Sequence, residues 1–121
     1  MKTVDQIQPN YGPVYAAALY PALCSTFHQH GYALAVHGSL ARDFDLIAVP
    51  WVETVSAPDD VIAALLADGL AVRSIGPAER KPHGRLAYTI TVGFGECACD
   101  LSFMPLAPPD ASAGDNSEIG Q

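Results

Sequence analysis

The sequence predicts an α/β protein of the α+β kind, with a mixed, largely antiparallel sheet of about five strands and two helices packed on it. Two segments carry apolar residues at helical spacing, and five shorter runs are apolar or alternate between apolar and polar residues. Glycine or proline bounds most of these runs, as expected for elements joined by turns. The length of 121 residues, of which 50% are hydrophobic and 16% charged, suits one packed domain.

The first helix is expected over residues 14–30, where apolar residues recur on one face. Pro21 lies inside this segment and removes a backbone hydrogen bond, so a kink or a short break is expected there. Gly31 then ends the helix at the position of a left-handed cap. A second helix is expected after a capping-box pattern in which Ser56 is the N-cap and Asp59 lies three residues on, and this helix stops at Gly69.

Two apolar runs, residues 32–37 and 43–49, are expected to be neighbouring strands, the second of which is closed by Pro50. The connection between them is too short to hold a crossover helix, so these strands should be antiparallel. A third strand is expected over residues 70–75. The polar residues 76–84, which include two prolines, should form a loop after it.

The last two strands are expected to form a hairpin. Residues 85–92 alternate between apolar and polar side chains, which is typical of a half-buried strand, and residues 97–103 return as its partner. If the hairpin turns symmetrically about residues 94–95, Asp100 lies opposite Thr89. This pairing places Asp100 on the polar face of the hairpin, where a cleft would lie.

Composition bounds the class of protein. Residues 1–106 are expected to form the domain and residues 107–121 a disordered C-terminal tail, because Ile119 is the only large apolar side chain there. The formal net charge of −7 argues against an extensive nucleic-acid-binding surface. No apolar run suits a membrane helix or a signal peptide, and the three cysteines lack metal-site spacing. A cytoplasmic protein with reduced thiols and no membrane contact is therefore expected.

The clearest chemical pattern is the run HGSLARDFDL at residues 37–46. On a strand, Asp43 and Asp45 project from the same face about 6–7 Å apart, close enough for one divalent cation to bridge them. A chain with thirteen acidic residues contains about one or two such pairs by chance, so the pair alone is weak evidence. Its position at the start of an otherwise apolar strand is more informative, because a solvated charge is seldom placed there.

Two further features accompany the aspartate pair. Gly38 lets backbone N–H groups approach a ligand, and the Ser39 hydroxyl adds a contact to a phosphate. Asp100 is a third carboxylate flanked by apolar residues in the middle of a predicted strand. These side chains are therefore candidates for one site.

An apolar strand, then Gly38-Ser39, a spacer, an Asp-x-Asp pair and a later strand Asp resemble the nucleotidyltransferase superfamily, the fold shared with DNA polymerase beta. The resemblance covers about residues 14–104. It implies that Gly38 and Ser39 position nucleotide phosphates. It also implies that the catalytic residues Asp43, Asp45 and Asp100 hold two Mg²⁺ (or Mn²⁺) ions for in-line attack on the α-phosphorus of a nucleoside triphosphate. The implied reaction transfers a nucleotidyl group to a hydroxyl acceptor that the sequence does not name.

The sequence also departs from the family pattern. The spacer between Ser39 and Asp43 is shorter than the family usually has, and His37 occupies a place usually taken by an aliphatic or aromatic residue. The helical domain that usually shapes the nucleotide and acceptor sites is missing after Asp100, so another copy in a homo-oligomer, or a partner subunit, is expected to supply it. Two alternatives remain open: a degraded nucleotidyltransferase-fold module that acts as a partner or regulatory subunit, and a purely structural domain with incidental aspartates.

The basic residues concentrate in one region. Four of the six bases, Arg73, Arg80, Lys81 and Arg85, fall within residues 73–85, and Arg42 abuts the aspartate pair. Such groups bind phosphates, and arginine offers a forked contact. His83 is a candidate ligand or proton shuttle. Arg42, Lys81, His83 and Arg85 are therefore candidate nucleotide-binding residues, with ordinary solvated loop charges as the alternative.

Overall fold

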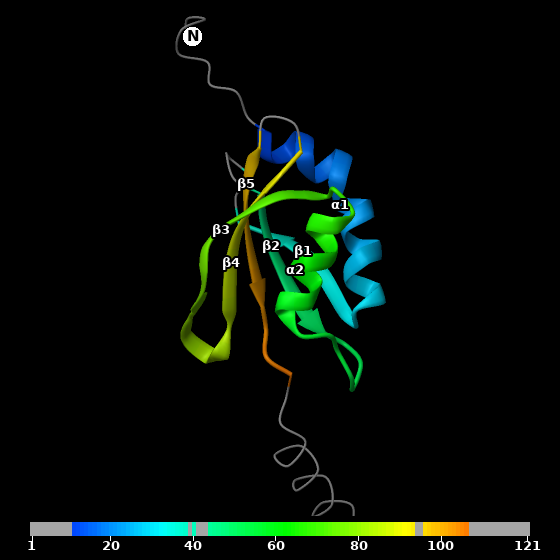
Figure 1. The fold of residues 1–121 in the computed structure, drawn as a ribbon, viewed down its shortest axis with the longest axis vertical. Helices are drawn as coiled ribbons and strands as arrows, with labels where there is room; N and C mark the ends of the chain where they lie inside the picture. Colours follow the sequence, from blue (N-terminus) through cyan, green and yellow to red (C-terminus); the bar gives the residue numbers. More distant parts are fainter. Residues whose placement is uncertain (1–10, 39, 41–43, 94–95, 107–121) are drawn as a thin grey trace, which may run out of the picture.

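The computed structural model describes residues 11–38, 40, 44–93 and 96–106, which form one mixed sheet with two helices (Figure 1). Its elements are α1 (Tyr11–Gln29), β1 (Tyr32–His37), β2 (Phe44–Pro50), α2 (Pro58–Ala67), β3 (Ala71–Arg80), a 3₁₀ turn (Pro82–Gly84), β4 (Leu86–Val92) and β5 (Cys97–Phe103). The predicted fold class is confirmed. Among the described residues, no helix has the length and apolar character needed to cross a membrane.

The sheet has the strand order β1-β2-β5-β4-β3. The pairs β1–β2, β4–β5 and β3–β4 are antiparallel, and β2 pairs with β5 in parallel. The antiparallel β1–β2 pair and the β4–β5 hairpin were both expected from the sequence. The last strand along the chain therefore lies in the middle of the sheet and joins its two halves.

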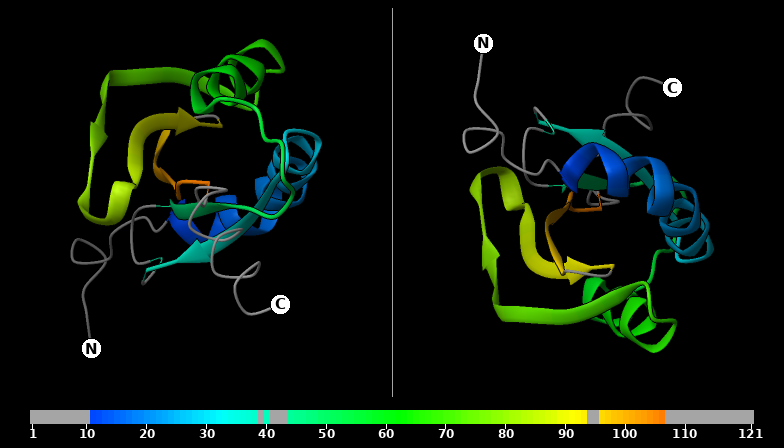
Figure 2. Two further views of the ribbon diagram at one scale, coloured as in Figure 1. Left: turned by 90° about the horizontal axis from the view of Figure 1, so that it is seen from below. Right: turned by 90° about the horizontal axis from the view of Figure 1, so that it is seen from above.

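Helix α1 begins at Tyr11, earlier than expected, and continues through Pro21 without a break. Its course changes direction along its length (Figure 2), which is how a helix accommodates an internal proline. Gly31 follows the helix with φ +92°, as predicted for its left-handed cap. The Gly31 carbonyl accepts a hydrogen bond of 3.1 Å from the Trp51 N–H, which fixes the end of β2 beside the start of β1.

The start of α2 differs from the predicted capping box. Ala57 is the N-cap, Pro58 lies in the first turn, and no side chain in the described part of the chain caps the helix. The Ser56 hydroxyl instead lies 2.7 Å from Nδ1 of His30, and the Asp59 carboxylate accepts a hydrogen bond from the Tyr88 hydroxyl. Both side chains of the expected box are therefore engaged by partners from other segments.

Strand β3 is longer than predicted, because it continues through much of the expected loop to Arg80. Its pairing with β4 shifts register between Ile75 and Glu79. A bulge of this kind accommodates Gly76 and Pro77, which fit poorly in a regular ladder. The extension places Glu79 and Arg80 at the same end of the sheet as the start of β4, where Arg80 pairs with Leu86.

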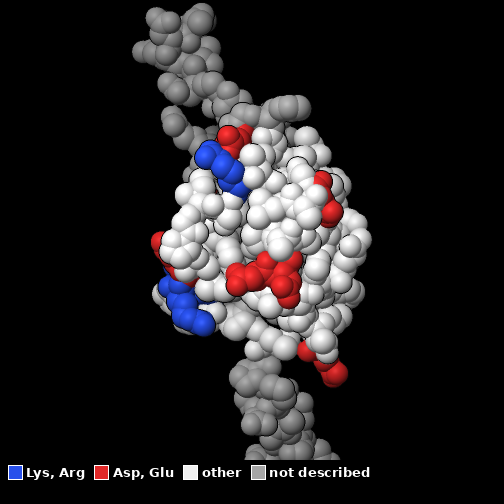
Figure 3. Space-filling view, viewed as in Figure 1, with Lys and Arg blue, Asp and Glu red and all other residues white. Residues whose placement is uncertain are grey.

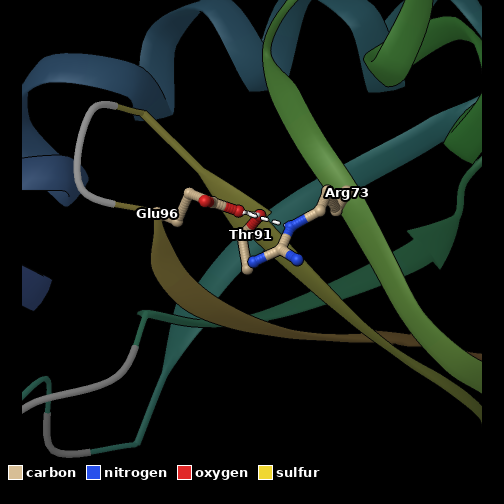
Figure 4. A network of polar contacts seen from close by, with 3 residues as sticks. All are labelled: Arg73, Thr91 and Glu96. Atoms are coloured by element: carbon tan, nitrogen blue, oxygen red, sulfur yellow. Dashed lines mark hydrogen bonds and ion pairs between the residues drawn. The ribbon is translucent and has the colours of Figure 1, made fainter.

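A polar network fastens β3 to the turn of the β4–β5 hairpin (Figure 4). Nε of Arg73 lies 2.6 Å from Oε1 of Glu96, and the Thr91 hydroxyl donates to the same oxygen at 3.0 Å. Hydrogen bonds from Arg73 and Thr91 lower the pKa of the Glu96 carboxyl. Arg73 therefore has a structural role as the partner of Glu96, and it does not line the cleft with the candidate phosphate-binding residues.

The core lies between the sheet and the two helices, with α1 against β1, β2 and β5, and α2 against β3 and α1 (Figure 2). Phe103 of β5 is at its centre, with ring centroids 5.8 Å from Phe27, 5.2 Å from Tyr32 and 5.5 Å from Tyr88. Phe44, Leu46 and Leu101 are also fully buried here. Alternation along the strands then directs the residues between them to the opposite face.

The predicted tail, residues 107–121, lies outside the described residues, so its disorder remains a prediction. Deleting residues 108–121 is expected to change the free energy of unfolding by less than about 0.5 kcal/mol, because the segment has so little apolar surface to bury. Urea denaturation of the two proteins measures the difference. A clearly lower midpoint for the shortened chain would show that the tail packs on the domain.

Candidate functional site

A cleft of about 440 Å³ crosses the face of the sheet that the helices leave open. Residues from all five strands line it, together with Lys81 and Arg85 from the β3–β4 connection. Its floor carries the carboxylates of Asp45 and Asp100, and Lys81 and Arg85 supply its bases. The sequence candidates that lie within the described residues thus fall into those that line this cleft and those that do not.

The floor is a row of side chains in register across the sheet. His37 pairs with Asp45, Asp45 with Asp100, Asp100 with Thr89, and Thr89 with Ile75. Paired residues of neighbouring strands point to the same face, and such strands lie about 4.8 Å apart. Asp45 and Asp100 are therefore direct neighbours on one face. The pairing of Asp100 with Thr89 is the one expected from a symmetrical hairpin.

Gly38 lies against the Asp45 carboxylate. Its φ is +80°, and a Cβ added there would lie 2.5 Å from Oδ2 of Asp45. No side chain fits this space without moving the carboxylate, and the backbone conformation itself favours glycine. The glycine of the predicted Gly-Ser pair is thus in contact with one of the predicted acids.

The two bases of the cleft are held by different partners. Arg85 Nη1 donates a hydrogen bond of 3.2 Å to the hydroxyl of Ser102, a buried residue of β5. Lys81 Nζ lies 2.9 Å from Oε1 of Glu79, and both of these residues line the cleft. Sequence reasoning missed Glu79 and Ser102. The pairing of residues 87 and 102 follows from the same hairpin symmetry, whereas Glu79 was assigned to a loop.

Other candidates lie elsewhere. His83 is exposed within the 3₁₀ turn at φ +67° and does not line the cleft, and neither does the exposed Arg80. Ser39, Arg42 and Asp43 lie outside the described residues.

On the face seen in Figure 3, Lys and Arg side chains occupy two separate places, and acidic side chains gather over the start of α2, which carries Asp59 and Asp60.

Two titratable groups near the floor stay neutral at ordinary pH. Burial raises the pKa of the Cys99 thiol, and the negative charges of Asp100 and Asp45 raise it further. Burial also raises the pKa of the Tyr88 hydroxyl, as does its hydrogen bond to Asp59. The charge of the cleft therefore comes from its carboxylates and its bases.

The donor set at the floor is made of oxygen. Carboxylate oxygens are the ligands that Mg²⁺ and Mn²⁺ prefer. Within the described ranges, no three His, Cys, Asp or Glu side chains gather as a metal-binding group. Asp45 and Asp100 are two of the three acids named by the sequence pattern, and the third is outside these ranges.

No protein-family model matches the chain, and no curated protein is similar to it in sequence. Solved structures are similar to it in fold. The Cid1 poly(U) polymerase bound to MgATP superposes with a TM-score of 0.55 at 18% identity, over 80% of this chain and 33% of that one. The same polymerase bound to Mg 3′-dATP gives 0.54 at 19% identity, over 80% and 32%. The domain thus has a nucleotidyltransferase-like fold and spans about a third of the polymerase chain.

Proposed function

We propose that this domain binds a nucleoside triphosphate together with Mg²⁺ or Mn²⁺ and transfers a nucleotidyl group to a hydroxyl acceptor. The observation that carries the proposal is the register of Asp45 and Asp100 on neighbouring strands, in a cleft that also holds Lys81 and Arg85. The nucleotidyltransferase-like fold supports it. So do the MgATP and Mg 3′-dATP bound by the polymerase that shares this fold.

The residues present fit a hard divalent cation. Asp45 and Asp100 supply neighbouring carboxylates, and the absence of a side chain at Gly38 lets the Asp45 carboxylate lie against the backbone there. Asp43, from the sequence pattern, would complete the ligand set. When bound, the cation supplies Lewis-acid activation of the phosphate and neutralises charge that develops during transfer.

The chain's own residues then bind and orient the nucleotide. Arg85, fixed by Ser102, and Lys81 present N–H donors to phosphate oxygens at one side of the cleft. Asp45 and Asp100 would hold the divalent cation at the floor of the cleft, where its charge would attract the phosphates. Phosphates held in this way would orient the α-phosphorus for attack by the acceptor hydroxyl.

A second candidate function is nucleotide binding without turnover, in a partner or regulatory subunit. It is favoured by two departures from the family pattern, the short spacer between Ser39 and Asp43 and the histidine at position 37. The cytoplasm remains the expected compartment.

Two measurements test these candidates. Millimolar Mn²⁺ with a non-hydrolysable triphosphate should raise the melting temperature, since a ligand that binds only the folded state stabilises it. Release of pyrophosphate from a hydrolysable triphosphate with hydroxyl acceptors then separates the enzyme from the binding module. No thermal shift would contradict both, and a shift without turnover would favour the module.

Replacing either base of the cleft should weaken nucleotide binding. Arg85→Ala or Lys81→Ala is expected to cost about 1–3 kcal/mol in affinity for a non-hydrolysable triphosphate with Mg²⁺, because charged hydrogen bonds are lost. Calorimetric titration measures this, and the loss should shrink at high salt. Arg80→Ala is the matched control, since Arg80 is a neighbouring base that does not line the cleft. Equal affinities in all variants would assign these bases to ordinary solvated charge.

A further inference from the structure

The two bases of the cleft differ in how far they are neutralised. Arg85 donates to the uncharged Ser102 hydroxyl, and among the described residues no carboxylate lies within ion-pair distance of its guanidinium. Lys81 is paired with the carboxylate of Glu79 at 2.9 Å. An arriving anion therefore meets an uncompensated charge at Arg85 and a compensated one at Lys81.

The Glu79–Lys81 pair is built into the end of β3. The two residues are separated by one position, so in extended backbone their side chains leave on the same side. The Lys81 N–H donates a 2.7 Å hydrogen bond to the Arg85 carbonyl, which closes the turn that follows. Both side chains are partly exposed, at 40% for Lys81 and 69% for Glu79, so the pair can exchange partners with a dissolved ligand.

We propose that Glu79 is an intramolecular competitor for Lys81 that sets the affinity of the cleft for polyphosphate. A polyphosphate that reaches Lys81 must displace the Glu79 carboxylate, which then stands unpaired beside the bound anion. This lowers the affinity for the nucleotide and, equally, for pyrophosphate, so that a phosphate product leaves more readily. The proposal rests on the proposed function, because it assigns polyphosphate to this cleft.

The test uses inorganic tripolyphosphate, which probes the bases without a nucleoside, in calorimetric titrations at low salt. Glu79→Gln keeps the shape of the side chain and removes its charge. Its affinity for tripolyphosphate should exceed that of the wild type by about two- to fivefold, the range expected for an exposed ion pair. Glu53→Gln is the matched control, since it changes the net charge equally and Glu53 is exposed outside the cleft.

A double-mutant cycle identifies the mechanism. In a Lys81→Met background the gain from Glu79→Gln should disappear, because no ammonium remains to be released. Two results would overturn the proposal: an equal gain in tripolyphosphate affinity in both backgrounds, or the same gain from Glu53→Gln. Either would show that Glu79 acts only through the net charge of the protein and not by competing for Lys81. Tripolyphosphate that binds neither the wild type nor Glu79→Gln would overturn it as well.

Titration with a metal-bound non-hydrolysable nucleotide separates this proposal from the proposed function. Tight nucleotide binding that Glu79→Gln leaves unchanged would overturn the role of Glu79 and preserve the function. The nucleotide could instead fail to bind while the double-mutant cycle with tripolyphosphate gives the expected result. That outcome would contradict the proposed function and keep Glu79 as the competitor for Lys81 in a general anion-binding site.

Discussion

Asp45→Asn is expected to abolish the stabilisation of this domain by Mn²⁺ while leaving the metal-free protein as stable as the wild type, or more so. Asparagine keeps the shape of the side chain but removes one of two like charges that stand in register on neighbouring strands. A cation present at one hundred times its dissociation constant stabilises a protein by about 2.7 kcal/mol, and most of this should be lost.

Melting curves with and without millimolar Mn²⁺ and a non-hydrolysable triphosphate measure this effect. Asp68→Asn is the matched control, because Asp68 is exposed at the end of α2 and does not line the cleft. A purely structural Asp45 predicts the reverse pattern, with a metal-independent loss of stability on substitution. Identical Mn²⁺ responses in the wild type and in Asp45→Asn would remove Asp45 from the metal site.

Gly38→Ala is expected to destabilise the domain and disable the same site. A left-handed backbone costs a non-glycine residue about 1–2 kcal/mol, and at Gly38 the new Cβ would also meet Oδ2 of Asp45 at 2.5 Å. The combined cost should be about 2–4 kcal/mol, since overpacking adds a similar amount. Because the Asp45 carboxylate must move, the response to Mn²⁺ should fall as well.

The structure offers a closely matched control in Gly69→Ala. Gly69 has nearly the same φ, +77°, but no atom of the described residues lies within 4 Å of the space that a Cβ would occupy. Urea denaturation of the two variants therefore separates backbone strain from the contact with Asp45. If both variants lose the same free energy of unfolding and keep their Mn²⁺ response, the contact between Gly38 and Asp45 does not contribute to stability or to the site.

The parts of this fold that sequence predicted best are those set by nearby residues. The hairpin turn dictates the pairing of Asp100 with Thr89, because a short connection leaves few registers available. The pairing of Asp45 with Asp100 is of another kind. It joins parallel strands from distant parts of the chain, and no local pattern in the sequence specifies which strand β2 will meet.

The predictions that failed did so for a related reason. Ser56 and Asp59 have the spacing of a capping box. In the structure their side chains instead form hydrogen bonds with His30 and Tyr88, both of which are remote in sequence. Tertiary partners of this sort override a local preference. Glu79 escaped notice because the prolines around it suggested a loop, whereas a bulge keeps that segment in the sheet.

The central place of β5 has a consequence for how the protein folds. The strands on either side of it, β2 and β4, are bonded to each other only through this last strand. Until β5 inserts, each half of the sheet presents an open edge, which is the surface on which partly folded chains aggregate. Such long-range closure is intrinsically slow. Because Phe103 and Asp100 share that strand, the step that seals the core during synthesis also completes the pair of carboxylates, and a nascent chain that lacks β5 has neither.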